Sequence, residues 1–194
     1  MLKNVKFEAS VYDYSKLIKT DKTQIVLVGK SNVGKSSFIN ALCNNKKLAK
    51  VGQTPGKTRS INYYNVNNEY YLVDLPGYGY STMSESEKSK INRLIDTYVS
   101  NTPEIKHIYF LVDIRNKPSE NDRAMYEWLL AKEIPFSIIA TKADKIAKTK
   151  MQTQANEITK YLFAKEKITP FSSDKKINRI FYPIFLFHFS PIIL

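Results

Sequence analysis

Residues 29–36 read Gly29-Lys30-Ser31-Asn32-Val33-Gly34-Lys35-Ser36, and they satisfy every position of the pattern G-x-x-x-x-G-K-[ST]. The apolar run QIVLV at 24–28 precedes them and is typical of a buried parallel strand, and residues 34–42 predict a helix that follows the glycine loop. In such a loop the backbone N–H groups turn inward around phosphate oxygens, and the helix N-terminus adds positive charge. A plain glycine turn is the alternative, but the flanking strand and helix argue against it. The octapeptide therefore predicts a phosphate-binding loop.

Two side chains of this loop are candidates for binding the phosphates and a metal ion. Lys35 is expected to reach the β- and γ-phosphates of a nucleotide, and the hydroxyl of Ser36 is expected to bind Mg²⁺. Ser37 follows directly in the expected helix. We therefore expect nucleotide contacts from Gly29 through Ser37.

A second element, Asp74-Leu75-Pro76-Gly77, closes an apolar strand about 40 residues after the phosphate loop. A carboxylate at such a strand end can hold a Mg²⁺-bound water, and the backbone N–H of Gly77 can approach a γ-phosphate. The four-residue pattern is weak alone, since a surface turn also fits it. Its position after the phosphate loop favours the metal and phosphate role.

Between these elements lies the polar segment Thr54-Pro55-Gly56-Lys57-Thr58-Arg59-Ser60. A threonine here could add its hydroxyl to Mg²⁺ once a γ-phosphate is present. Thr54 and Thr58 both qualify by position, and an ordinary loop is the alternative.

The third element is Thr141-Lys142-Ala143-Asp144, which follows the apolar run PFSIIA at 135–140. The carboxylate of Asp144 can accept hydrogen bonds from N1–H and the exocyclic amine of guanine, a donor pair that adenine lacks. The stem of Lys142 can lie along the base plane. Phe171-Ser172-Ser173 could add a backbone N–H to guanine O6. Together these elements predict a guanine nucleotide as ligand.

The rest of the chain predicts an α/β fold in which strands alternate with helices, so that helices cover both faces of a mostly parallel sheet. Asn67-Asn68 predicts a hairpin whose second strand ends at Asp74. The capping boxes Ser84-x-x-Glu87 and Ser119-x-x-Asp122 each predict a helix start, and Met125, Trp128 and Leu129 recur on one face of the second helix. The expected strands are 3–11, 24–28, 61–66, 69–74, 107–113, 135–140 and 168–171, and the remaining helices are 34–42 and one with the stripe Met151, Ala155, Ile158 and Leu162.

Composition narrows the class of protein further. The chain has 194 residues, 43% of them hydrophobic, and a net charge of +12, which excludes disorder and favours polyanionic partners, most simply nucleic acid. The single Cys43 cannot form an internal disulfide and suits a reducing, cytoplasmic setting. A secretory signal and a run of about 20 apolar residues are both lacking, so we expect a cytoplasmic protein without a stable membrane anchor.

The motifs GKSNVGKSS, TPGKTRSINYYNV, DLPGYGYS, VDIRNKP, ATKADKI and PFSS resemble those of the EngB-type (YihA/YsxC) bacterial GTPases, within the Era- and TrmE-like group of translation-factor-related P-loop GTPases. The resemblance runs from about residue 7 to 173. It implies a Ras-like fold with one antiparallel hairpin strand, binding of GTP or GDP with Mg²⁺, and a role in large ribosomal subunit assembly that supports cell division and septation. It assigns Mg²⁺ ligation to Ser36 and Thr58, places Gly56–Ser60 at the nucleotide, and gives catalytic roles to Lys35, Thr58 and Gly77.

Two departures from the wider pattern matter. Tyr78 stands where Ras-like enzymes place a water-orienting Gln, so we expect slow intrinsic hydrolysis. The segment 180–194, IFYPIFLFHFSPIIL, has two prolines and no charged face, where the family has an amphipathic helix. We therefore expect a G domain over 1–179 and an atypical apolar tail over 180–194. Any helix there should stop before Pro183, and we expect the rest to be disordered or packed on the domain as an irregular apolar strand, with a membrane anchor as the alternative.

These features predict a monomeric GTPase switch that binds ribosomal RNA or a large-subunit precursor. An interaction module that binds nucleotide without useful hydrolysis is the main alternative, and a P-loop kinase of small molecules is disfavoured because Thr141–Asp144 would then have no role. Asn32 adds K⁺ as a candidate cofactor, since some related GTPases use an Asn at this position to hold it.

Overall fold

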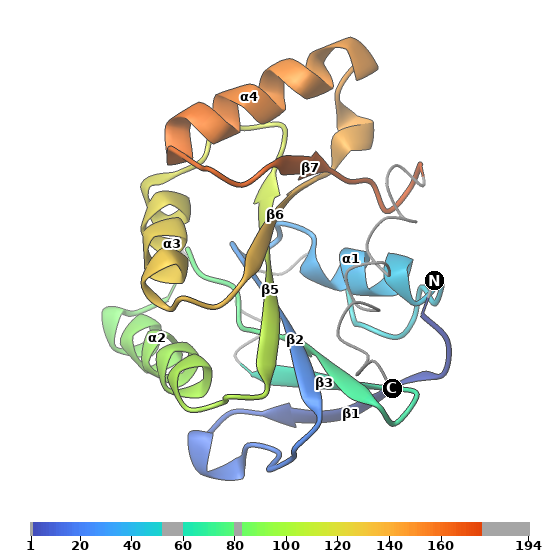
Figure 1. Cartoon of the computed structure of the whole chain (residues 1–194), viewed down its shortest axis with the longest axis vertical. Helices are drawn as coiled ribbons and strands as arrows, with labels where there is room; N and C mark the ends of the chain where they lie inside the picture. The colour runs from blue at the N-terminus through green and yellow to red at the C-terminus, as the bar shows by residue number, and fades with distance from the viewer. Residues whose placement is uncertain (1, 52–59, 80–82, 176–194) are drawn as a thin grey trace, which may run out of the picture.

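Seven strands form a single sheet in the order β1-β3-β4-β2-β5-β6-β7 (Figure 1). The computed structural model describes residues 2–51, 60–79 and 83–175. The strands are β1 (Val5–Val11), β2 (Thr23–Gly29), β3 (Ile61–Val66), β4 (Tyr70–Asp74), β5 (Ile105–Asp113), β6 (Phe136–Thr141) and β7 (Ile168–Pro170). The helices are α1 (Lys35–Leu42), α2 (Glu85–Ser100), α3 (Glu120–Ala131) and α4 (Met151–Leu162), with short 3₁₀ turns η1 (Tyr14–Lys16), η2 (Ala143–Lys145) and η3 (Lys148–Lys150).

The strand β3 runs against its two neighbours, while β4, β2, β5, β6 and β7 pair in parallel. It forms the predicted hairpin with β4, and the turn residues Asn67 and Asn68 take positive φ angles of 53° and 63°. Asparagine tolerates this left-handed backbone, which matches the right-handed twist of the paired strands. The predicted sheet, mostly parallel with one antiparallel hairpin strand, is confirmed.

Both faces of the sheet are buried, which explains the nearly continuous apolar runs of the central strands. Val26 and Val28 of β2 face the core that α2, α3 and α4 cover, whereas Ile25 and Leu27 face the core that α1 covers. Figure 1 shows α1 on the opposite side of the sheet from α2 and α3. Helices therefore lie on both faces, as the alternation of strands and helices predicts.

The two capping boxes also form. Ser84 caps α2 with Glu87, and Ser119 caps α3 with Asp122. The buried face of α3 differs from the sequence prediction, because it centres on Asp122, Tyr126 and Leu129, whereas Met125 and Trp128 are only partly buried. Tyr126 and Asp122 are buried because their polar atoms find partners, Glu166 and Tyr78, that are distant in sequence.

The tail prediction for 180–194 lies outside the described residues, and with it the proposed boundary at residue 179. Within the described ranges, no helix has both the length and the apolar character to cross a bilayer.

His107 in β5 gives the fold a testable pH dependence. Only 7% of the residue is exposed, its Nε2 lies 3.0 Å from Ser137 Oγ, and burial lowers its pKa from 6.5 to about 4. Between these values the unfolded chain binds a proton that the folded protein does not, so stability falls as the pH is lowered. We expect this residue to cost about 2 kcal/mol of stability between pH 7 and pH 5. Urea unfolding of the wild type and of His107→Gln across this pH range measures this loss of stability. Parallel profiles of stability against pH for the two proteins would contradict the prediction.

Candidate nucleotide site

The phosphate loop links the end of β2 to the first turn of α1, as its motif predicts. Gly34 has a φ of 117°, a left-handed conformation that L side chains rarely adopt, and it is the residue before the helix. No side chain of the described residues caps α1 at this end. The first N–H groups of a helix have no partner within the helix, so those of α1 remain available to an anionic ligand.

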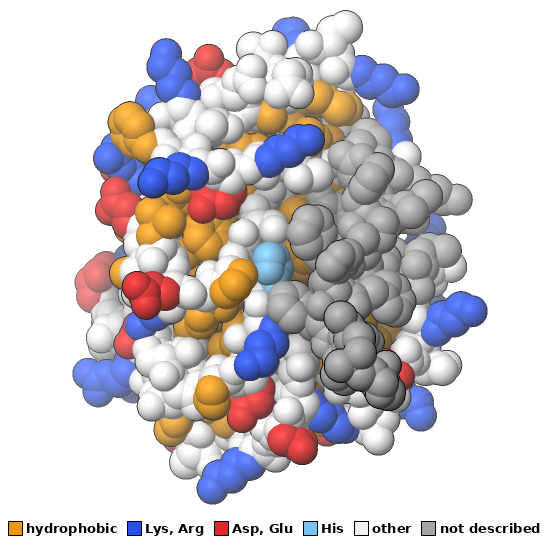
Figure 2. Space-filling model, in the orientation of Figure 1, with side chains coloured by type: hydrophobic (Ala, Val, Ile, Leu, Met, Phe, Trp, Pro, Cys, Tyr) orange, Lys and Arg blue, Asp and Glu red, His pale blue; other side chains and the backbone are white. Residues whose placement is uncertain are grey.

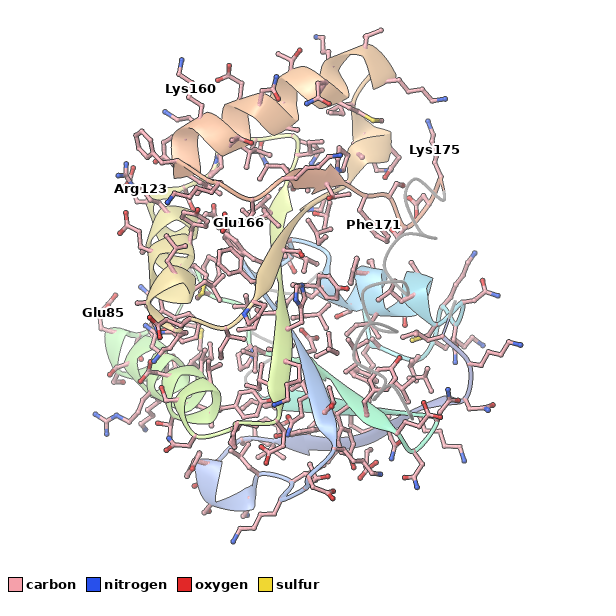
Figure 3. All side chains as sticks on the ribbon, viewed as in Figure 1. Glu85, Arg123, Lys160, Glu166, Phe171 and Lys175 are labelled. Carbon is pink, nitrogen blue, oxygen red and sulfur yellow. The ribbon has the colours of Figure 1, made fainter. Side chains whose placement is uncertain are left out.

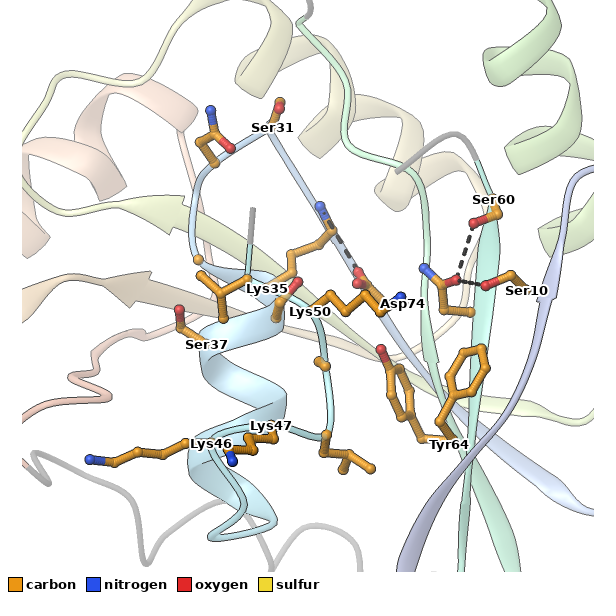
Figure 4. A pocket seen from close by; sticks show the side chains of 18 of the residues that line it. Ser10, Ser31, Lys35, Ser37, Lys46, Lys47, Lys50, Ser60, Tyr64 and Asp74 are labelled. Carbon is orange, nitrogen blue, oxygen red and sulfur yellow. Dashed lines mark hydrogen bonds and ion pairs between the residues drawn. The ribbon is translucent and has the colours of Figure 1, made fainter. Parts of the chain in front are cut away.

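Lys35 and Asp74 form the charged centre of the site (Figure 4). Lys35 Nζ lies 4.0 Å from Asp74 Oδ1 and 3.4 Å from the carbonyl oxygen of Gly29. The two residues are 7% and 2% exposed. Burial lowers the pKa of Lys35, an effect that Asp74 opposes, and burial raises the pKa of Asp74 to about 6, an effect that Lys35 opposes. Two buried charges therefore face the space where a nucleotide phosphate would bind.

The same residues fit a hydrated Mg²⁺. Asp74 Oδ1 is buried and has no hydrogen-bond partner among the described residues. An orphaned buried carboxylate oxygen is costly unless a ligand satisfies it. Ser36 lines the same cleft. One hydroxyl and one carboxylate suit Mg²⁺, which keeps several waters and takes further oxygens from phosphates.

A cleft of about 1230 Å³ opens beside this pair. Its floor comes from the phosphate loop and α1, and one wall comes from β1 and β3, including Phe7 and Tyr64. Lys46, Lys47 and Lys50 line it on the loop after α1 (Figure 4). Such a volume accommodates a nucleotide, and the lysines add positive charge to the cleft.

Of the predicted segment 54–60, the structure describes only Ser60. Thr54, Gly56, Lys57, Thr58 and Arg59 lie outside the described residues. Ser60 lines the cleft, and its Oγ lies 3.1 Å from Asn62 Oδ1.

The segment after Asp74 lies directly on the phosphate loop. Leu75 N donates to the carbonyl oxygen of Leu27 at 3.0 Å, and after Pro76 the N–H of Ser31 donates to the carbonyl oxygen of Tyr78 at 2.9 Å. A Cβ atom at Gly77 would lie 2.8 Å from Ser31 N and 2.9 Å from Ser31 Cα. Only glycine allows this approach, so Gly77 lies where the sequence predicts it, beside the phosphate loop.

The predicted base-recognition residues come together at the ends of β6 and β7. Thr141 Oγ1 lies 2.6 Å from the carbonyl oxygen of Val33, and Lys142 Nζ donates to that of Asn32 at 2.8 Å. Both residues thus bind the phosphate loop. Thr141 stands where many GTPases have Asn, and its hydroxyl reaches the loop carbonyl directly.

Asp144 is held in place by the segment after β7. Ser172 Oγ donates to Asp144 Oδ1 at 2.6 Å, and Lys145 Nζ lies 3.1 Å from Oδ2. Burial alone would raise the pKa of Asp144, but these two hydrogen bonds, a backbone hydrogen bond and the charge of Lys145 together outweigh burial and keep the pKa below its usual range. Ala143 N donates to the carbonyl oxygen of Phe171 at 3.0 Å, and the Phe171 ring packs on Phe38 of α1 (Figure 3). Asp144 and Ser172 are therefore adjacent, and the carboxylate is ionised at neutral pH, as guanine recognition requires.

Sequence reasoning missed two contacts that support this site. Asp113 Oδ2 accepts hydrogen bonds from Lys142 Nζ at 2.8 Å and from Arg115 at 2.7 Å, so it orients Lys142. Tyr78 donates its hydroxyl to Asp122 Oδ1 at 2.7 Å. The sequence did offer one signal for the role of Asp113, because this residue ends an apolar strand expected to lie beside the phosphate loop.

Comparison with known proteins agrees with this geometry. Residues 24–142 match the family described as 50S ribosome-binding GTPase. A probable GTP-binding protein EngB of Thermoanaerobacter pseudethanolicus is 41% identical over 178 residues, which is 91% of this chain and 93% of the relative. The protein of the same description from Clostridioides difficile is 48% identical over 155 residues, 79% of this chain and 76% of the relative.

Solved structures show the same fold. The crystal structure of a probable GTP-binding protein EngB superposes with a TM-score of 0.71 at 24% identity, covering 86% of this chain and 97% of that one. Era in complex with MgGDPNP and nucleotides 1506–1542 of 16S ribosomal RNA superposes with a TM-score of 0.68 at 23% identity, covering 89% of this chain and 58% of that one.

Proposed function

The chain belongs to the EngB family of GTP-binding proteins, which are GTPases, and from this we propose that it is a slow, Mg²⁺-dependent switch in assembly of the large ribosomal subunit. Normal cell division and septation would depend on that role. The observation that carries the proposal is the joint geometry of the site. The buried Lys35–Asp74 pair lies at one end of the phosphate loop, and Thr141 and Lys142 connect the same loop to Asp144.

In the proposed GTP-bound state, Ser36 and Thr58 would hold Mg²⁺, and Asp74 would accept a hydrogen bond from its hydration shell. Mg²⁺ supplies charge neutralisation at the β- and γ-phosphates. Lys35 binds the same phosphates, and the N–H of Gly77 donates to the γ-phosphate. The support is the buried Oδ1 of Asp74, which no described residue satisfies with a hydrogen bond, and the close approach of Gly77 to Ser31.

Thr58→Ala separates this switch from a static nucleotide site. Its hydroxyl should matter only when the γ-phosphate and Mg²⁺ draw it in, so we expect about a tenfold loss in affinity for a non-hydrolysable GTP analogue, from one lost charge-assisted contact. GDP affinity should change less than twofold. Titration of both nucleotides measures the difference, and equal losses would contradict the role of Thr58.

Slow hydrolysis follows from the chemistry of Tyr78. A phenol offers no amide to orient the attacking water, and the Tyr78 hydroxyl is already bonded to Asp122. Asn32 lies in the phosphate loop and is our candidate for holding K⁺, whose charge would then stabilise the transition state. Hydrolysis rates in KCl and NaCl at equal ionic strength would differ if Asn32 holds K⁺.

We propose ribosomal RNA or a large-subunit precursor as the macromolecular partner. The net charge of +12 supports salt-dependent binding to phosphates. Figure 2 shows Lys and Arg side chains spread over the visible face among fewer acidic ones. The structural neighbour Era is described in complex with 16S ribosomal RNA, which gives one RNA-bound example of this fold.

Two measurements test the proposal. GDP, GTP and ATP affinities should show strong preference for guanine nucleotides. Co-sedimentation with ribosomal subunits at several salt concentrations should show GTP-dependent binding that weakens with salt. The alternative is an interaction module that binds nucleotide without useful hydrolysis. The observation in its support is that the Tyr78 hydroxyl is bonded to Asp122. GTP turnover that stays negligible even with ribosomal particles present would support that alternative.

A further inference from the structure

Tyr78 connects the phosphate loop to α3 through two bonds made by opposite ends of the residue. Its carbonyl oxygen accepts the N–H of Ser31 at 2.9 Å, in a parallel bridge that pairs residues 30 and 78. Its hydroxyl donates to Asp122 Oδ1 at 2.7 Å. Tyr78 lies 44 positions from Asp122, so the residue joins parts of the chain that are distant in sequence.

The α3 end of this connection is rigid. Asp122 uses its other oxygen, Oδ2, to accept from Ser119 N at 2.7 Å and Ser119 Oγ at 2.6 Å, which forms the cap of α3. Asp122 and Tyr78 are 7% and 8% exposed. Burial, and then the charge of Asp122, raise the pKa of Tyr78 well above its usual range, so the phenol stays a proton donor.

At the phosphate-loop end of this connection lies Gly77, the residue immediately before Tyr78. A side chain at Gly77 would collide with Ser31, so the position of this backbone relative to the phosphate loop is tightly defined. Gly79 on the other side has a φ of 76°. Of residues 77–79, only Tyr78 has a side chain. Its hydroxyl is therefore the group that bonds this stretch of backbone to α3.

We propose that Tyr78 is a positioning residue for the γ-phosphate: its bond to Asp122 holds the N–H of Gly77 in place before GTP binds. The inference rests on the proposed contact between Gly77 and the γ-phosphate. A donor that is already ordered costs less free energy to engage. Only GTP uses that donor, because GDP has no γ-phosphate. The Tyr78–Asp122 bond therefore favours GTP over GDP without touching either nucleotide.

The test is the ratio of the affinities for GDP and the imido analogue of GTP in Tyr78→Phe, which removes only the hydroxyl. Losing the bond should weaken binding of the analogue about fivefold, the usual net worth of one hydrogen bond. GDP affinity should stay within twofold. Under single-turnover conditions the hydrolysis rate should fall while the GDP release rate is unchanged.

Tyr126 provides a matched control on the same helix face. It is also buried, but its hydroxyl donates at 2.8 Å to the carboxylate of Glu166, which precedes β7 (Glu166 is labelled in Figure 3), and not to a residue that contacts the phosphate loop. Tyr126→Phe should lower thermal stability by a similar amount and leave the affinity ratio unchanged. If both variants shift the ratio equally, Tyr78 acts only through general stability and the proposal is wrong.

A double-mutant cycle completes the experiment. In Asp122→Ala the partner is already lost, so adding Tyr78→Phe should change the ratio no further. An unchanged or increased preference for GTP in Tyr78→Phe would overturn the positioning role. Failure of the proposed function would look different, because the wild type itself would then bind the analogue and GDP without Mg²⁺-dependent discrimination.

Discussion

Lys35→Ala is expected to abolish tight binding of GDP and GTP alike. The lysine is the buried cation of the phosphate loop, and the β-phosphate that it is expected to contact is present in both nucleotides. The loss should be at least 3 kcal/mol, or more than about 100-fold, since the phosphate loses its buried cation and is left beside a buried carboxylate whose charge is no longer compensated. That carboxylate belongs to Asp74, whose Oδ1 lies 4.0 Å from Lys35 Nζ and has no hydrogen-bond partner among the described residues.

Lys47→Ala is the matched control, because it removes the same charge from an exposed residue that lines the same cleft. Its effect on GDP affinity should be small, since exposed charges are well screened. Fluorescent GDP titration at constant ionic strength compares the two variants. Similar losses in both would mean that general positive charge, rather than the buried position of Lys35, provides phosphate affinity.

Much of the fold follows from local signals that the structure repeats. The parallel strands are buried on both faces, so their apolar runs are continuous and easily located. The turn at Asn67-Asn68 and the capping boxes at Ser84 and Ser119 are formed by residues within four positions of each other. Such signals depend only on neighbouring residues and their backbone, so they can be recognised in a single sequence.

The candidate site was predictable to the same extent. Lys35, Asp74, Thr141, Lys142 and Asp144 lie together because the carboxyl ends of β2, β4 and β6 meet at one edge of the sheet. The partners that hold these residues were not predictable. Tyr78 pairs with Asp122 and Lys142 pairs with Asp113 across 44 and 29 positions, and nothing local to either residue specifies such a contact.

The buried face of α3 was predicted only in part, for the same reason. Hydrophobic periodicity identifies Leu129, which is buried, and Met125 and Trp128, which pack partly buried against the core, but it does not identify Asp122. Asp122 is nevertheless buried, because its carboxylate accepts hydrogen bonds from Ser119 and Tyr78. A polar side chain can be buried in the core when hydrogen-bond partners are buried beside it. Which residues become those partners is decided by the tertiary structure.

Base selection should depend on Asp144 as strongly as phosphate binding depends on Lys35. In Asp144→Asn the side chain keeps one acceptor and gains a donor that would face the exocyclic amine of guanine. We expect GTP and GDP affinity to fall by about 3 kcal/mol, or roughly 100-fold, as when a recognition site leaves buried polar groups unpaired. Xanthine carries an oxygen where guanine carries that amine, so the affinity for xanthosine diphosphate should rise in the same variant.

The neighbouring Asp174→Asn is the control for this exchange. Its carboxylate lies 3.7 Å from the same Lys145 that pairs with Asp144, but it is 69% exposed. It should leave both affinities within twofold, because an exposed ion pair contributes little. Competition titrations with GDP and xanthosine diphosphate on the three proteins give the result. A gain for xanthine together with the loss for guanine requires a folded site, so it separates recognition by Asp144 from simple loss of structure. Equal losses for both nucleotides, or unchanged GDP binding, would remove Asp144 from base recognition.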